Sequence, residues 1–221
     1  MPCSIDKKTK ITLIFNQLDM ETLDHMFRVG GYVNILSRGL RNFSDSLNPD
    51  VVNELPLYGG AAFYHDIGKA FVPTNIILKP DKFSVEERRI MEKHPLFAQV
   101  VFHDICEGLV GGVPEELVDL ANSCAVFHHE WWNGMGYPYG IAHTDIPFIA
   151  RVTSVCDAYD AMTSNRVYGR ARSHQYACRE LLKCSGTQFD PDMVKIFLKC
   201  ENEIFLASNS AGSDKTVPRL G

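Results

Sequence analysis

Tyr64-His65-Asp66-Ile67-Gly68-Lys69 is the stretch of sequence that decides the fold and the chemistry, and it lies at the end of a strongly apolar segment with helical spacing. A buried histidine and aspartate are costly without polar partners. Because neighbouring side chains on a helix splay apart, His65 and Asp66 can serve one metal ion, or Asp66 can bridge two. By itself the pair fits equally well an exposed helix end at which Gly68 breaks the turn.

The rest of the chain is predicted to be all-α. Residues 71–83 and 133–147 contain the prolines and glycines of loops. Strand patterns are weak, and we find no internal repeat. Apolar residues recur at helical spacing in six segments: Leu23–Leu40, Val51–Tyr64, Val85–Phe102, Glu115–Phe127, Ile149–Met162 and Ala177–Cys184.

The bulk composition predicts one domain. The chain has 221 residues, of which 45% are hydrophobic, and this is enough for a single core. We expect a short tail at residues 1–10, one folded domain at 11–206, and a disordered tail at 207–221 that is rich in serine, glycine and aspartate.

Charge and cysteine content exclude several classes of protein. A net charge of -5 argues against DNA binding, which needs a dense basic surface. The seven cysteines are an odd number without a CxxC pair, so we expect reduced thiols rather than disulfides or a thiolate zinc site. No segment has the length of a membrane span or the pattern of a signal peptide, so we expect a cytoplasmic protein.

Further candidate metal ligands are scattered along the chain. Glu21 and His25 share a helix face at a spacing of four residues, although such pairs are more often solvated. A lone His94 is more often a packed or surface residue than a ligand. The vicinal pair His128-His129 can serve two neighbouring metals, and Asp157 needs a cation or a hydrogen-bond partner within its apolar helix.

Together these nitrogen and oxygen ligands exceed what one tetrahedral ion needs, so we expect two or three metals. Imidazole and carboxylate without thiolate suit iron or manganese, with zinc or nickel as alternatives. Asp160, one turn after Asp157, is a candidate to support a ligand indirectly. The predicted ligands are Glu21, His25, His65, Asp66, His94, His128, His129 and Asp157.

Two motifs in order resemble the HD-GYP family, a branch of the HD-domain phosphohydrolases. The first is the stretch 65–69, and the second is the stretch 128–138, which reads HHEWWNGMGYP. The resemblance extends from about Glu21 to Phe197. It implies an HD-domain helical bundle with a GYP loop and additional C-terminal helices.

The resemblance also implies a function, namely metal-dependent hydrolysis of cyclic di-GMP to pGpG, with GMP as the alternative end product. The matching residues imply that Asp66 and Lys69 are catalytic and that the ligands above hold the metals, with Glu21 present in three-metal sites. Lys69 also suits a phosphate oxygen as a point charge. Tyr137 of the GYP loop and Arg166 are the implied contacts to the nucleotide.

One departure keeps alternatives open. The basic residue expected three places after Arg166 is Gly169, and Arg170 follows one place later, so Arg170 is a substitute contact in a shifted register. The alternatives are a phosphodiesterase for another cyclic dinucleotide such as cyclic GMP-AMP, and a noncatalytic receptor that binds the messenger. A GGDEF-type or other regulatory protein is a further possible partner.

Overall fold

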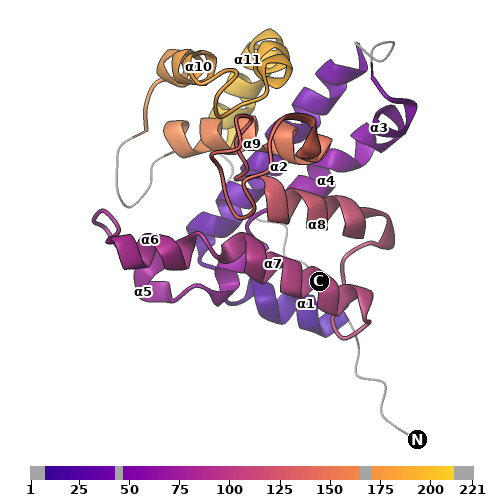
Figure 1. Ribbon diagram of the computed structural model, residues 1–221, viewed down its shortest axis with the longest axis vertical. Helices are drawn as coiled ribbons and strands as arrows, with labels where there is room; N and C mark the ends of the chain where they lie inside the picture. Colours follow the sequence, from indigo (N-terminus) through magenta and orange to yellow (C-terminus); the bar gives the residue numbers. More distant parts are fainter. Residues whose placement is uncertain (1–7, 43–46, 165–170, 212–221) are drawn as a thin grey trace, which may run out of the picture.

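The computed structural model describes residues 8–42, 47–164 and 171–211, and these residues form a helical bundle (Figure 1). No strand occurs within these ranges; the only pairing of this kind is an isolated bridge between Ser185 and Phe189. The α-helices are α1 (Lys8–Phe15), α2 (Met20–Arg41), α3 (Pro49–Glu54), α4 (Tyr58–Ala62), α5 (Thr74–Ile77), α6 (Val85–Met91), α7 (His94–Cys106), α8 (Val118–Phe127), α9 (Phe148–Thr163), α10 (His174–Lys183) and α11 (Pro191–Ala211). Short 3₁₀ helices are η2 (Leu55–Leu57), η3 (Ile67–Phe71), η4 (Glu115–Leu117) and η5 (His143–Asp145).

Helix α2 is the centre of the bundle. It packs against α4, α9 and α11, and its buried residues Met26, Val29, Val33 and Leu36 recur every three or four positions. The Asp19 side chain accepts a hydrogen bond from the backbone N–H of Thr22 and so fixes the start of the helix. His25 therefore lies buried in the core, at a position that the start and the apolar face of α2 define.

Prolines divide two of the predicted helices. The segment 51–64 is α3, η2 and α4 in succession, because Pro56 has no N–H to donate and its ring disfavours a continuous helix. The segment 85–102 is likewise two helices, α6 and α7, with Pro95 in the first turn of α7. The expected loop at 71–83 contains one helical turn, α5.

The C-terminal boundary also differs from the prediction. Helix α11 continues to residue 211, so residues 207–211 are helical and not part of a disordered tail. Ile204 is fully buried, and the hydroxyls of Ser208 and Ser210 donate to the carbonyls of Phe205 and Leu206. Local hydrogen bonds and packing thus outweigh the polar composition, whereas residues 212–221 lie outside the described ranges.

The predicted amino-terminal tail at 1–10 is shortened in the same way. Helix α1 begins at Lys8 and packs near η3.

In the described ranges no helix is both long and apolar enough to cross a membrane.

Candidate metal centre

Seven of the eight predicted metal ligands come together in two adjoining groups. In each group the candidate ligand atoms all lie within 4.8 Å of one another. The residues come from α2, α7, α9, the end of α8 and the turn between α4 and η3. One group is Asp66, His94, His128 and His129, and the other is His25, His65 and Asp157.

Asp66 lies between the two groups, and its two carboxylate oxygens face different partners. Oδ1 lies 3.3 Å from Nε2 of His94 and 3.8 Å from Nε2 of His128. Oδ2 lies 3.4 Å from Nε2 of His25 and 3.3 Å from Nε2 of His65. This is the arrangement expected of a carboxylate that bridges two cations.

Hydrogen bonds at the outer nitrogens fix the direction of the imidazoles. Nδ1 of His65 lies 2.9 Å from the carbonyl oxygen of Ala62, and Nδ1 of His94 lies 2.8 Å from that of Met91. Nδ1 of His128 lies 3.1 Å from the carbonyl oxygen of Cys124. A carbonyl only accepts, so each Nδ1 donates and each Nε2 presents a lone pair to the centre.

Three buried atoms at the centre have no hydrogen-bond partner. They are Oδ1 of Asp66, Nε2 of His94 and Nε2 of His128. Buried polar atoms are almost always satisfied, and all three of these atoms are acceptors once Nδ1 carries the imidazole proton. A divalent cation among them would satisfy all three, so the residues present fit a metal site.

Burial keeps two of these imidazoles neutral. Loss of solvation lowers the pKa of His94 to about 4 and that of His128 to about 3. Burial also moves the pKa of His129 well below its usual value. Neutral imidazole is the form that binds a metal, so at pH 7 these side chains need lose no proton to do so.

In the second group, nearby carboxylates raise the pKa of a histidine instead of leaving it neutral. Burial lowers the pKa of His25, but hydrogen bonds with Asp157, Asp160 and Asp66 more than offset this and raise it to about 10. Burial opposes ionisation of Asp66 too, yet Lys69 and the nearby imidazoles hold the pKa of Asp66 well below its usual range. The centre therefore contains ionised carboxylates at neutral pH.

Two glycines explain how the motifs can approach one another. A Cβ on Gly68 would lie 1.9 Å from the carbonyl oxygen of His94, so only glycine allows α7 to pack against the turn after Asp66. A Cβ on Gly136 would lie 2.3 Å from the backbone nitrogen of Trp131, where the 128–138 segment folds back on itself. Both residues act through backbone contact.

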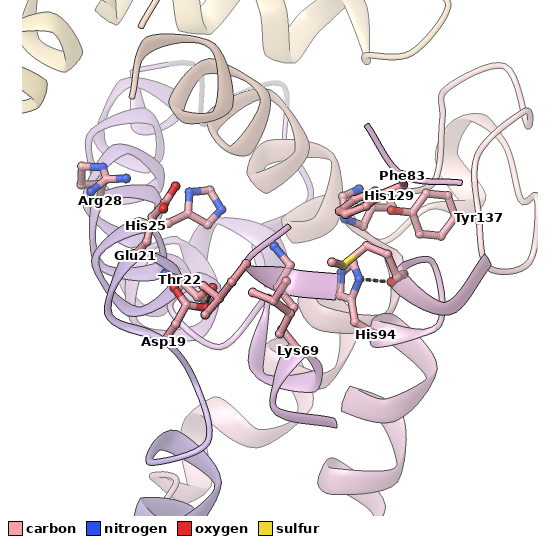
Figure 2. Close-up of a pocket in the computed structure, with 13 residues that line it drawn as sticks. Asp19, Glu21, Thr22, His25, Arg28, Lys69, Phe83, His94, His129 and Tyr137 are labelled. Atoms are coloured by element: carbon pink, nitrogen blue, oxygen red, sulfur yellow. Dashed lines mark hydrogen bonds between the residues drawn. The ribbon is translucent and has the colours of Figure 1, made fainter. Parts of the chain in front are cut away.

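A pocket opens directly onto the candidate metal ligands. Figure 2 shows Lys69, His94, His129 and Tyr137 around it, and the Lys69 ammonium also pairs with Oδ2 of Asp66 at 2.5 Å. The Tyr137 ring stacks on the imidazole of His129, with centroids 4.7 Å apart and planes 24° apart. An aromatic face and a cation therefore meet beside the candidate metal ligands.

Glu21 lines the same pocket but is not part of either ligand group. It begins the first turn of α2, and Figure 2 shows its carboxylate on the side of the helix that carries His25. The predicted role of Glu21 in a third metal site therefore rests on position alone.

The sequence reasoning missed Arg28, which supports the centre from outside. Its guanidinium donates two hydrogen bonds to Asp160, at 2.7 and 2.9 Å, and Asp160 in turn accepts from Nδ1 of His25 at 2.7 Å. Asp160 is fully buried, and burial opposes its ionisation, but His25 and Arg28 lower its pKa to about 2. The position of Arg28, three residues after His25 on an apolar helix, was the available signal.

Glu130 was also missed as a structural element of the loop that carries Tyr137. Its buried carboxylate accepts from the backbone N–H of Tyr139 at 2.7 Å and of Gly140 at 3.0 Å.

Arg166 and Arg170, the predicted substrate contacts, lie outside the described residues.

Comparison with known proteins agrees with this architecture and identifies the family. The HD domain family matches residues 19–193, and the chain belongs to this family. A "probable cyclic di-GMP phosphodiesterase" of Vibrio cholerae is 35% identical over 90% of this chain and 45% of its own length. A "cyclic di-GMP phosphodiesterase" of Thermotoga maritima is 32% identical over 88% of this chain and 48% of its own length.

Another relative is named for a different substrate. The "3'3'-cGAMP-specific phosphodiesterase 2" of Vibrio cholerae is 30% identical over 88% of this chain and 34% of its own length. The chain spans less than half the length of these curated relatives.

A solved structure confirms the all-helical fold. An HDG"Y"P protein from Bdellovibrio bacteriovorus superposes with a TM-score of 0.56 at 19% identity, over 89% of this chain and 56% of that one. These comparisons confirm the resemblance to HD-GYP cyclic di-GMP phosphodiesterases that the sequence motifs indicate.

Proposed function

We propose that the chain is a metal-dependent phosphodiesterase that hydrolyses cyclic di-GMP. The observation that carries the proposal is the position of Asp66 between two groups of ligands, with three buried acceptor atoms that a cation would satisfy. The names of the relatives support the substrate class.

Two divalent ions are the minimum that the geometry supports. The proposed ligands of one are His94, His128 and His129, those of the other are His25, His65 and Asp157, and Asp66 is shared. The donor set of imidazole and carboxylate favours iron or manganese over magnesium, and zinc and nickel remain chemically acceptable. Glu21 is the proposed additional ligand of a third ion at the pocket wall.

Divalent ions bound there would lower the pKa of water and offset the negative charge of a phosphodiester. The protein's own groups then bind and orient the substrate. Lys69 presents its ammonium to the pocket and would contact a phosphate oxygen in which negative charge accumulates during attack. Asp66 keeps Lys69 in place through their ion pair.

The pocket wall suits a nucleobase next to the phosphate. Tyr137 and Phe83 both line the pocket, and aromatic rings of this kind stack on bases without requiring a particular sequence. Arg166, with Arg170 as a substitute, is the proposed partner of a phosphate or guanine edge. We also propose that the protein acts in the cytoplasm, because the described cysteines are all free thiols.

Two alternatives make different predictions. The relative named for 3'3'-cGAMP and the glycine at position 169 favour a hybrid dinucleotide as the second candidate substrate. A noncatalytic receptor, which binds the messenger or a GGDEF-type protein without turnover, would still have to keep seven buried or half-buried ligands together.

Parallel kinetics with the two dinucleotides test the proposal. Metal-loaded protein should give a higher kcat/KM for cyclic di-GMP than for 3'3'-cGAMP, with pGpG or GMP as the product. A higher kcat/KM for 3'3'-cGAMP would show that the hybrid dinucleotide is the preferred substrate. Tight binding of both dinucleotides without hydrolysis would show that the protein is a receptor and not an enzyme.

A further inference from the structure

A third group of candidate metal ligands lies between α10 and α11. It consists of His174, Cys178 and Glu201, whose ligand atoms all lie within 4.8 Å of one another. His174 and Cys178 are one turn apart on α10, so they share a face, and Glu201 faces them from α11. Figure 1 shows these two helices side by side, at the upper left of the view.

Two distances within this group are close to those between neighbouring ligands of a tetrahedral zinc ion. Nε2 of His174 lies 3.6 Å from Sγ of Cys178 and 3.7 Å from Oε2 of Glu201. For zinc bond lengths, neighbouring corners of a tetrahedron are separated by about 3.5 Å for nitrogen and sulfur and about 3.4 Å for nitrogen and oxygen. Nδ1 of the same ring lies 3.8 Å from Sγ of Cys178, so the imidazole would have to turn to aim Nε2 at an ion shared with this thiolate.

Two contacts position the imidazole of His174. Nδ1 of His174 lies 3.0 Å from the hydroxyl of Tyr159, and the imidazole packs against the ring of Phe205 with centroids 4.8 Å apart. The hydroxyl of Tyr159 can donate or accept, so Nε2 keeps the lone pair that a metal needs when Nδ1 donates to this hydroxyl. Tyr159 is fully buried, so this orientation is held by the core.

We propose that His174, Cys178 and Glu201 bind a zinc ion that joins α10 to α11. The Glu201 side chain is 37% exposed, which leaves room for a water molecule as the fourth ligand. Thiolate, imidazole and carboxylate together favour zinc over the harder ions proposed for the catalytic centre. The sequence analysis did not predict this site because its cysteine has no CxxC partner and its ligands come from separate helices.

Zinc binding at Cys178 releases a proton. Zinc binds the thiolate, so the Zn–S bond forms as the S–H bond breaks and the proton passes to solvent.

Cobalt substitution separates this site from the catalytic centre. A thiolate bound to Co²⁺ gives an intense charge-transfer band in the near ultraviolet, whereas the two catalytic groups contain no cysteine. We expect titration of the metal-free full chain with Co²⁺ to produce this band, and added Zn²⁺ to abolish it.

The variants assign the band to one thiol. Cys178→Ser should lose it, and Cys106→Ser, which changes an exposed cysteine, should keep it. Glu201→Ala keeps the thiol and changes a half-exposed side chain, so this variant should fold. Its affinity for Co²⁺ should be weaker by about tenfold or more. Each variant should retain its circular dichroism spectrum.

Three results would overturn the proposal. They are the absence of the band at saturating Co²⁺, a band that persists in Cys178→Ser, and an unchanged Co²⁺ affinity in Glu201→Ala. Because the readout is the spectrum and not turnover, a failure here is distinguishable from a failure of the proposed phosphodiesterase activity.

Discussion

Nε2 of His25 lies 3.2 Å from Nε2 of His65, in the interior of the bundle. Nδ1 of His65 donates to a carbonyl, and Nδ1 of His25 donates to the ionised carboxylate of Asp160. Two lone pairs at this distance repel unless a proton or a metal ion lies against them. Carboxylates raise the pKa of His25 to about 10, so at neutral pH the proton is the occupant that a metal must displace.

Metal uptake should accordingly release a proton from His25. The raised pKa means that His25 is protonated at pH 7, whereas the lowered pKa values of His94 and His128 mean that these two side chains are already neutral. We expect about one proton to be released per chain, from Nε2 of His25. Calorimetric titration with Mn²⁺ in buffers of different ionisation enthalpy measures this number, and a binding enthalpy independent of the buffer would contradict it.

Asp160→Asn should weaken metal binding without removing a ligand. The substitution removes the charge that orients His25 and pairs with Arg28. Loss of such support typically costs about 10- to 100-fold in metal affinity. Competition with a metal-binding dye measures the affinity, and Asp192→Asn, an exposed position on α11, serves as the control. Equal affinities for the two variants would show that Asp160 does not position His25.

Glu21→Ala should remove one metal and leave a two-metal remainder if Glu21 binds a third ion. Glu21 lines the pocket beside His25, whereas Asp24 on the same helix is exposed, so Asp24→Ala is the matched control. Metal per chain, measured by plasma mass spectrometry after removal of free ions, should fall only in the Glu21 variant. Unchanged stoichiometry would refute the assignment of Glu21.

Gly68→Ala should destabilise the fold, whereas Gly31→Ala should not. A Cβ on Gly68 would overlap the backbone of His94 and Ala98, but a Cβ on Gly31 meets nothing within 4 Å. Overpacking typically costs about 1–3 kcal/mol, and rigid backbone on both sides puts Gly68→Ala at the upper end of that range. Gly31→Ala, at an exposed position in α2, should stabilise by about 0.5–1 kcal/mol through helix propensity. Urea unfolding measures both, and equal midpoints would contradict the packing described for Gly68.

The sequence predicted the helices that present the site better than it predicted their breaks. The periodicity of residues 23–40 and 149–162 was sufficient for α2 and α9, because one apolar face of each packs into the core. The breaks at Pro56 and Pro95 were readable from proline chemistry, but apolar spacing continued across both. Residues 207–211 were expected to belong to a disordered tail but are helical. Their helix depends on packing around Ile204, and local composition does not encode this packing.

The candidate site was predictable where motifs carry its residues and not where the fold alone brings them together. His65, Asp66, His128 and His129 lie in two short motifs, and the structure places them within one centre. Arg28 belongs to neither motif, and its partner Asp160 is 132 residues away in the chain, so its position after His25 was the one signal in the sequence.

The most direct test of the central claim is turnover of cyclic di-GMP, under anaerobic conditions, by protein loaded with iron or manganese and by its Asp66→Ala variant. Metal content is measured in both samples. Because Asp66 is proposed to bridge the two groups of ligands, we expect hydrolysis by the loaded protein, and loss of both activity and bound metal in the variant. No hydrolysis by fully loaded protein, or equal activity in the Asp66 variant, would contradict the account.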